Sequence, residues 1–325
     1  MIATSYSVCA ISEKSLRVGI MTEKAVDRSA LYAIEQLSQS ECMLSSTRSQ
    51  RNESSFEGAR GTQIYYQTWR PSGKSKAIVV INHGIGEHSA RYAHVAEHLA
   101  RFGFTVWACD LRGHGKSGGK RGHVDSFDDY LIDVAQLTRI ARDHFPGVKA
   151  FLLGHSLGGL IASCFAERYP TELDGLVASA PALKEIMKVS IMKILLAKAL
   201  TNIMPTFSTT TGLDPNLLSH DQEVVRKYVE DPLVHKVVTA RWFTEYRRAQ
   251  SETMQGAGKI TMPCLIIQSG ADGIVDPSAT NEFFKKIKSS DKTLKIYEDF
   301  YHENLNEVGK ESVLGDIDTW LSARV

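Results

Sequence analysis

The sequence has no excess of either charge. Its 38 lysines and arginines balance 37 aspartates and glutamates, and the net charge of the 325 residues is +1. Basic and acidic residues are interspersed and form no long runs of one sign. Because binding to nucleic acid depends on a concentrated positive charge, we expect no nucleic-acid partner. A composition of 43% hydrophobic and 23% charged residues is typical of a globular protein.

Uninterrupted apolar segments and paired cysteines are also lacking. The longest apolar stretch, Leu183–Met204, is broken by lysines and one glutamate, which argues against a membrane-spanning helix. Residues 1–20 have no basic start followed by an apolar run, so no signal peptide is predicted. The five cysteines show no C-x-x-C or similar metal-binding spacing. These absences favour reduced, buried thiols and a cytoplasmic protein.

The chain divides by composition near residue 52. Residues 1–52 are rich in serine, threonine and charge, which is typical of a disordered extension, although 22–37 has a short helical pattern. Residues 53–325 contain apolar strand segments that alternate with helical segments. This alternation predicts one α/β domain with a mostly parallel sheet covered by helices on both faces.

The expected elements of this domain can be given by residue range. Predicted strands are Gln63–Trp69, Ala77–Asn82, Thr105–Cys109, Ala150–Gly154, Gly175–Ala178, Cys264–Ser269 and Thr293–Tyr297, and predicted helices include Tyr92–Phe102, Phe127–Phe145, Leu160–Tyr169 and Pro277–Lys288. Between about 181 and 250 the strand pattern stops while helical patterns continue. This segment is too long for a loop, so we predict an inserted helical cap.

A G-x-S-x-G motif follows one of the predicted strands. Gly154-His155-Ser156-Leu157-Gly158 lies between the strand Ala150–Gly154 and a predicted helix. A tight strand-to-helix turn would hold the serine in a strained conformation, with its hydroxyl projecting beyond the sheet. The motif and its context predict that Ser156 is a catalytic nucleophile of the α/β-hydrolase fold.

The base and the acid should follow the serine in the order Asp or Glu, then His. His302 is the one histidine beyond the last candidate acid, and it lies just after the strand Thr293–Tyr297. Asp272 and Asp276 compete as the acid. Asp276 precedes Pro277 at a helix start, where it is expected to act as an N-cap. We therefore favour Asp272 as the residue that orients the base.

A second glycine-bearing loop follows the strand Ala77–Asn82. Its sequence, His83-Gly84-Ile85-Gly86-Glu87-His88, can present the backbone N–H of Ile85 to an oxyanion, together with the N–H of Leu157. A metal site built on the two histidines is an alternative. No third ligand at a suitable spacing supports it, so neither a metal nor an organic cofactor is expected.

The motifs taken together resemble the monoacylglycerol lipase/lysophospholipase family of S33-like α/β-hydrolases. The resemblance rests on HGIGEHSARY at 83–92, DLRGHGKS at 110–117, GHSLGG at 154–159 and YHENLNE at 301–307, in that order. It covers residues 53–325 and implies cleavage of one-chain acylglycerols into fatty acid and glycerol. It assigns the triad to Ser156, Asp272 and His302, and the oxyanion donors to Ile85 and Leu157.

The resemblance also implies a polar end of the pocket that receives glycerol. Glu87 and Arg91 would bind substrate there, and a buried structural ion pair is the equally valid alternative. Ile85 is bulkier than the small residue expected at its position, and residues 1–52 have no counterpart in the family. The expected partner is a small lipid ester.

The cap segment Leu183–Met204 admits two interpretations. It can be a helix, or two helical pieces, packed on the core, or it can be an amphipathic lid that covers an acyl-chain tunnel and contacts lipid aggregates or a membrane surface. Trp242, Phe243 and Tyr246 are expected in the core rather than against ligand. A lysophospholipase or general carboxylesterase is the nearest alternative function, and a non-catalytic ligand receptor on the same fold is a more distant one.

Overall fold

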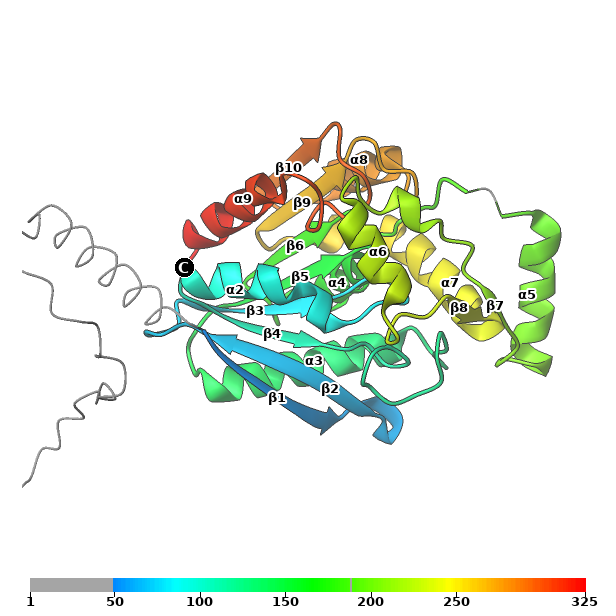
Figure 1. Cartoon of the computed structure of the whole chain (residues 1–325), viewed down its shortest axis with the longest axis horizontal. Coiled ribbons are helices and arrows are strands. Elements are labelled where there is room, and N and C mark those ends of the chain that lie inside the picture. The colour runs from blue at the N-terminus through cyan, green and yellow to red at the C-terminus, as the bar shows by residue number, and fades with distance from the viewer. Residues whose placement is uncertain (1–48, 188) are drawn as a thin grey trace, which may run out of the picture. The chain divides into compact units, whose positions relative to one another are not determined.

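The computed structural model describes residues 49–187 and 189–325, so the helical pattern predicted at 22–37 lies outside the described residues. An eight-stranded sheet with the order β1-β2-β4-β3-β5-β6-β9-β10 forms the centre (Figure 1). β2 pairs antiparallel with both β1 and β4. The strands β4, β3, β5, β6, β9 and β10 are mutually parallel. The strands are β1 (Gln50–Glu57), β2 (Gln63–Arg70), β3 (Ala77–Asn82), β4 (Phe104–Cys109), β5 (Ala150–His155), β6 (Gly175–Ser179), β9 (Cys264–Ser269) and β10 (Lys292–Tyr297).

Helices cover both faces of the sheet, as the alternating pattern predicted. Ile78 and Val80 of β3 point to one face, where they join a core with α3, α4 and α8. Val79 and Ile81 point to the other face and pack with α2 and α9. Strands buried on both faces explain the continuous apolar runs. These helices are α2 (Ala93–Arg101), α3 (Asp128–His144), α4 (Leu157–Arg168), α8 (Pro277–Lys286) and α9 (Lys310–Ser322).

Between β6 and β9 the chain leaves the sheet and forms an insertion, here called the cap. It contains helices α5 (Ile191–Ile203), α6 (Gln222–Glu230) and α7 (Ala240–Gly256), and two short strands, β7 (Ser208–Thr210) and β8 (Val237–Thr239). In Figure 1, α5 lies at the outer edge of the cap beside α7 and farthest from the sheet. None of the helices in the described part of the chain has the length and apolarity needed to span a bilayer.

Four sequence-based expectations differ from the structure. The apolar stretch Leu183–Met204 contains the helix α5 from Ile191, and Glu185 near its start instead forms an isolated β-bridge with Val275 in the loop after β9. The cap contains the strands β7 and β8, where no strand was expected. Strand β1 was not predicted and begins at Gln50, on the N-terminal side of the boundary expected at residue 53. Finally, α4 begins at Leu157 rather than Leu160.

The turn from β5 into α4 brings backbone segments into unusually close contact. A Cβ placed on Gly158 would lie 2.1 Å from the carbonyl oxygen of Asn82 at the end of β3, and one on Gly154 would lie 2.0 Å from the carbonyl oxygen of Gly158. Because the nearest atoms belong to the backbone, no side-chain rotation can relieve such a clash. Both glycines are required for the helix to start this close to the sheet.

This contact predicts the effect of a single methyl group. Gly158→Ala should lower the free energy of unfolding by about 1–3 kcal/mol or more, because the strand or the helix must shift. Gly315→Ala, within α9, is the matched control: nothing lies within 4 Å of its Cβ position, so a gain of about 0.5–1 kcal/mol is expected. Urea unfolding followed by circular dichroism measures both. Similar effects of the two substitutions would contradict the contact.

Candidate active site

Ser156 lies in the turn between β5 and α4, with backbone angles of φ 53° and ψ −116°. A positive φ is rare for a residue with a side chain and persists only where the surroundings enforce it. Three backbone hydrogen bonds do so here. The Ser156 N–H donates to Ser179 O (2.9 Å), and the Ser156 carbonyl accepts from the N–H groups of Leu160 and Ala182 (3.0 Å each). The turn therefore holds the serine hydroxyl in one position above the sheet.

His302 and Asp272 complete a chain of hydrogen bonds with this hydroxyl. The Nε2 atom of His302 lies 2.8 Å from Ser156 Oγ, and its Nδ1 lies 2.8 Å from Asp272 Oδ2. All three side chains are buried. With the carboxylate ionised, Nδ1 carries the proton and Nε2 is free to accept one from the serine. The residues predicted from the sequence are thus brought together at the carboxyl ends of β5, β9 and β10.

Electrostatics favours opposite charges on the two partners. Burial acts to lower the pKa of His302, but the charge of Asp272 and the hydrogen bond to it raise that pKa above its ordinary value. Burial acts to raise the pKa of Asp272. His302 and the backbone N–H groups of Ile274 and Val275 nevertheless hold that pKa below its usual range. The carboxylate is therefore set to stabilise a positively charged imidazole.

The competing carboxylate, Asp276, has a different position. Its side chain accepts a hydrogen bond from the N–H of Ser278 at the start of α8 and pairs with Lys184 at 2.7 Å. Pro277 occupies the first helical position, as expected for an N-cap followed by proline. Asp276 makes no hydrogen bond to His302 among the described residues, so the geometry places Asp272 rather than Asp276 against the imidazole.

The loop after β3 lies directly beside the serine. A Cβ on Gly84 would be 3.3 Å from Cβ of Ser156. Ile85 and Leu157 both line the cavity next to Ser156, and within the described chain neither backbone N–H donates a hydrogen bond. Leu157 is also the first residue of α4, where the helix dipole adds positive potential. Two unpaired donors beside the hydroxyl suit a developing oxyanion.

The histidines of this loop have hydrogen-bond partners within the protein. The Leu111 N–H donates to Nε2 of His83 at 2.9 Å, so Nδ1 carries the proton and donates to the carbonyl of Gly84 at 2.7 Å. Burial lowers the pKa of His83, which agrees with this neutral form. His88 uses its Nε2 to contact Asp231 of the cap at 2.8 Å. Both rings thus fix the loop in place.

Glu87 and Arg91 form a buried cluster behind the loop. Glu87 accepts from the N–H of Gly84 (2.6 Å) and the hydroxyl of Tyr92 (2.7 Å), and it also pairs with Arg91. Arg91 makes a two-pronged contact with Glu303, with both distances 2.7 Å. Neither Glu87 nor Arg91 lines the cavity at Ser156. Their contacts support positioning of the loop, and substrate binding by them stays a prediction.

Sequence reasoning missed three members of this neighbourhood: Tyr92, Glu303 and His155. Glu303 directly follows His302, and an acid next to the expected base was the signal available. The ring of His155 lies 4.9 Å from that of His302, between centroids. Burial, as the main cause, and the charge of the nearby His302, as the second cause, lower the pKa of His155 to about 3. This second imidazole is therefore neutral. Of the two neighbouring rings, His302 is therefore the one whose surroundings favour the protonated form.

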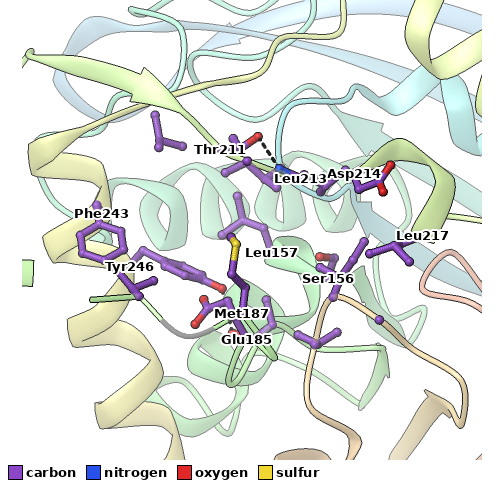
Figure 2. A pocket seen from close by; sticks show the side chains of 18 of the residues that line it. Ser156, Leu157, Glu185, Met187, Thr211, Leu213, Asp214, Leu217, Phe243 and Tyr246 are labelled. Carbon is purple, nitrogen blue, oxygen red and sulfur yellow. Dashed lines mark hydrogen bonds between the residues drawn. The ribbon is translucent and has the colours of Figure 1, made fainter. Parts of the chain in front are cut away.

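A cavity of about 360 Å³ opens from Ser156 into the cap. Figure 2 shows Ser156 and Leu217 on one side of it and Phe243 and Tyr246 of α7 across from them. The expectation for α7 was incomplete. Trp242 and Tyr246 belong to the core, as expected, but they line the cavity together with Phe243. Most of the remaining lining is apolar, with contributions from Leu157, Ala182, Met187, Val189, Leu213, Val238, Ile274 and Val275.

The assembled groups have the geometry of a nucleophilic acyl-transfer site. A serine hydroxyl is hydrogen-bonded to a base, the base is held by a carboxylate, and two backbone donors face the same cavity. Such a site converts an unreactive hydroxyl into a nucleophile. Its apolar cavity suits a long hydrocarbon chain.

Comparisons with known proteins agree with this geometry. A family model described as serine aminopeptidase, S33, matches residues 73–309. A monoacylglycerol lipase of Mycolicibacterium smegmatis is 35% identical over 280 residues, which are 86% of this chain and 99% of that protein. A monoglyceride lipase of Rattus norvegicus is 35% identical over 272 residues, or 82% of this chain and 89% of that protein.

A solved structure extends the likeness to three dimensions. The crystal structure of Paleococcus ferrophilus monoacylglycerol lipase superposes with a TM-score of 0.73 and 34% identity, covering 86% of this chain and 100% of that chain. The α/β-hydrolase fold and the resemblance predicted from the sequence are thereby confirmed. Since the family model matches well over half of the residues, the chain belongs to the serine aminopeptidase S33 family of α/β-hydrolases.

Proposed function

We propose that this protein is a serine hydrolase that cleaves monoacylglycerols into fatty acid and glycerol. The observation that carries the proposal is the hydrogen-bonded chain Ser156–His302–Asp272 at the inner end of an apolar cavity. Two relatives that cover most of the chain are a monoacylglycerol lipase and a monoglyceride lipase, which supports a one-chain glycerol ester as the substrate.

The proposed reaction proceeds through an acyl-enzyme. Ser156 Oγ attacks the ester carbonyl carbon while Nε2 of His302 takes its proton, and Asp272 stabilises the imidazolium. The N–H groups of Ile85 and Leu157 stabilise the oxyanion of the tetrahedral intermediate. When this collapses, the C–O bond to glycerol breaks and His302 gives its proton to the leaving oxygen. Water then repeats the sequence on the acyl-enzyme and releases the fatty acid.

The cavity dimensions support a substrate with a single acyl chain. Its volume of about 360 Å³ lies at the lower end of the range typical of ligand pockets, and the side chains from α7 and from the segment before α5 that line it are largely apolar. Ile85 lines the cavity at the serine, where its bulk would restrict the space available to the acyl or alcohol part of the ester. These features favour one flexible chain over a larger, branched ester.

The first prediction concerns the nucleophile and the substrate. The wild-type protein should hydrolyse 1- and 2-monoacylglycerols with a higher kcat/KM than lysophosphatidylcholine or p-nitrophenyl esters. Ser156→Ala should lower kcat by about 10⁶-fold, because the base alone cannot form an acyl-enzyme. Released fatty acid and p-nitrophenol measure turnover. Preference for small esters would remove the lipid assignment, and an inactive wild type that still binds lipid would favour a receptor.

The second prediction concerns pH. His302 is a base only when neutral, and its pKa lies above the ordinary value of about 6.5. Activity should therefore be low in acid and rise through a one-proton limb centred above pH 6.5. Asp272→Asn removes the negative charge that raises this pKa, so the limb should move to lower pH while kcat falls by about 10⁴-fold. A pH profile of kcat/KM for both proteins tests this. An unmoved limb would assign the titration to another group.

We also propose that α5 is the surface by which the enzyme contacts lipid aggregates. None of its residues is buried, and Met192 and Ile203 are 70% and 77% exposed. The exposed apolar side chains along and beside this helix are Met187, Ile191, Met192, Leu195, Leu196, Ile203, Met204 and Phe207. The helix contains two lysines and no acidic residue. An exposed apolar patch with positive charge is suited to a lipid surface.

The third prediction follows from this patch. Met192→Ser combined with Leu196→Ser should weaken partitioning onto vesicles containing anionic lipid by about tenfold or more, because each inserted side chain contributes about 1.5–3 kcal/mol when fully buried. Turnover of a water-soluble ester should change little, since neither residue lines the cavity. Ile132→Ser on α3, where the side chain is 48% exposed, is the matched control. Vesicle sedimentation measures binding. If the α5 variant and the Ile132→Ser control lose vesicle binding equally, α5 is not the lipid-contacting surface.

A further inference from the structure

Glu307 is a buried carboxylate that the reaction described above does not use. Its side chain is 1% exposed and lies in the loop between β10 and α9, residues 298–309, which carries His302 and is here called the base loop. The carboxylate accepts hydrogen bonds from two backbone N–H groups of its own loop, those of Tyr301 at 3.0 Å and Val308 at 2.7 Å. Tyr301 directly precedes His302, so one of these bonds acts on the residue next to the base.

The other donors to Glu307 come from the cap. The hydroxyl of Ser219 lies 3.0 Å from Oε1, and the same hydroxyl is 3.2 Å from the carbonyl of Asn306 in the base loop. The backbone N–H of His220 donates to Glu307 Oε1 at 2.9 Å, and the ring Nδ1 of His220 lies 3.1 Å from Glu307 Oε2. The ring of His220 also stacks on Tyr301, with centroids 3.7 Å apart. A single carboxylate therefore joins two segments that are far apart in sequence.

Backbone hydrogen bonds continue this junction up to the base itself. The N–H of His302 donates to Leu217 O at 3.3 Å, and the N–H of Glu303 donates to Leu218 O at 2.8 Å. Leu217 also lines the cavity at Ser156. The cap segment 217–220 is thus in contact with substrate space on one side and with the base loop on the other.

We infer that Glu307 is a positioning residue, which holds the imidazole of His302 in line with Ser156 by tying the base loop to cap segment 217–220. The inference rests on the proposed role of His302 as general base. Proton transfer requires Nε2 within hydrogen-bond reach of Oγ, and a displacement of about 1 Å can lower a rate by about 10²-fold. Because these hydrogen bonds join the base loop to the cap, the position of the His302 imidazole depends on the position of cap segment 217–220.

An ionised carboxylate suits this position, because each of its two oxygens faces at least one backbone N–H donor. Burial acts to raise the pKa of Glu307, but the N–H groups of Val308, Tyr301 and His220 and the ring of His220 hold it below its usual range. Glutamine has nearly the same shape, yet its NH₂ group would point at hydrogen-bond donors. Glu307→Gln therefore loses part of the network without creating a cavity.

The experiment compares Glu307→Gln and Ser219→Ala with the double variant in the full-length protein. For a water-soluble p-nitrophenyl ester, we expect Glu307→Gln to lower kcat by about 10- to 100-fold with KM nearly unchanged, because the base is displaced while the cavity is intact. Ser219→Ala should lower kcat by a smaller factor. The double variant should lose less than the product of the two factors, since both act through one junction.

A spectroscopic measurement separates positioning from loss of folding. The proton on Nδ1 of His302, shared with Asp272, should give a strongly deshielded NMR resonance that broadens or shifts in Glu307→Gln. Asp318→Asn is the matched control: it alters a buried carboxylate, 2.6 Å from Nε2 of His98, on α9. It should lower the melting temperature without changing kcat or this resonance.

The outcomes discriminate between this inference and the proposed function. If wild-type protein hydrolyses no ester, the proposed function fails. If the wild type is active but Glu307→Gln retains its kcat and its resonance, the positioning role is overturned while the function stands. If the fall in kcat matches only the fraction of unfolded protein, measured by circular dichroism, Glu307 has a structural role alone. The same conclusion follows if the double variant lowers kcat by the full product of the two single-variant factors.

Discussion

The close approach of α4 to the sheet is the constraint on which the site depends. Gly154 and Gly158 let the helix start at the edge of β5, so Ser156 must turn within one residue and takes a φ of 53°. This conformation projects the hydroxyl and places the first N–H of α4 beside it. The loops after β3, β9 and β10 end at the same edge of the sheet, because parallel strands bring their carboxyl ends together. Ser156 and His302 therefore meet through the topology, although 146 positions separate them in the sequence.

The parts of the fold with strong local patterns could be predicted from the sequence. Apolar strands buried on both faces and the glycines around Ser156 identified the sheet, the turn and the order of the triad. Strand β1 could not be found in this way, because all of its residues except Phe56 are polar and exposed and it is held by backbone pairing with β2. The β-bridge at the start of the cap could not be predicted for a related reason. Glu185 forms a β-bridge with Val275, which lies far along the chain, and local hydrophobic periodicity gives no information about such a pairing.

The cap is more than a cover over the cavity. The Ile186 N–H of the cap donates a hydrogen bond to Ile274 O at 3.0 Å in the loop after β9, which carries Asp272. The His235 N–H donates to Gly86 O at 2.8 Å in the loop after β3. The contact of the cap with the base loop runs through segment 217–220. Each loop that carries a proposed catalytic group is therefore fastened to the same insertion that presents α5 to its surroundings.

The charges around His302 are balanced rather than merely attractive. Asp272, Glu303 and Glu87 all act to raise the pKa of the imidazole, which favours the imidazolium formed during proton transfer. Unopposed carboxylates would also favour the protonated form of the resting imidazole, and a protonated base cannot accept the serine proton. Arg91 lies between Glu87 and Glu303 and offsets part of their charge. The buried ion pairs of Arg91 with Glu87 and Glu303 are thus placed to moderate the charge around His302 as well as to fix the loop after β3.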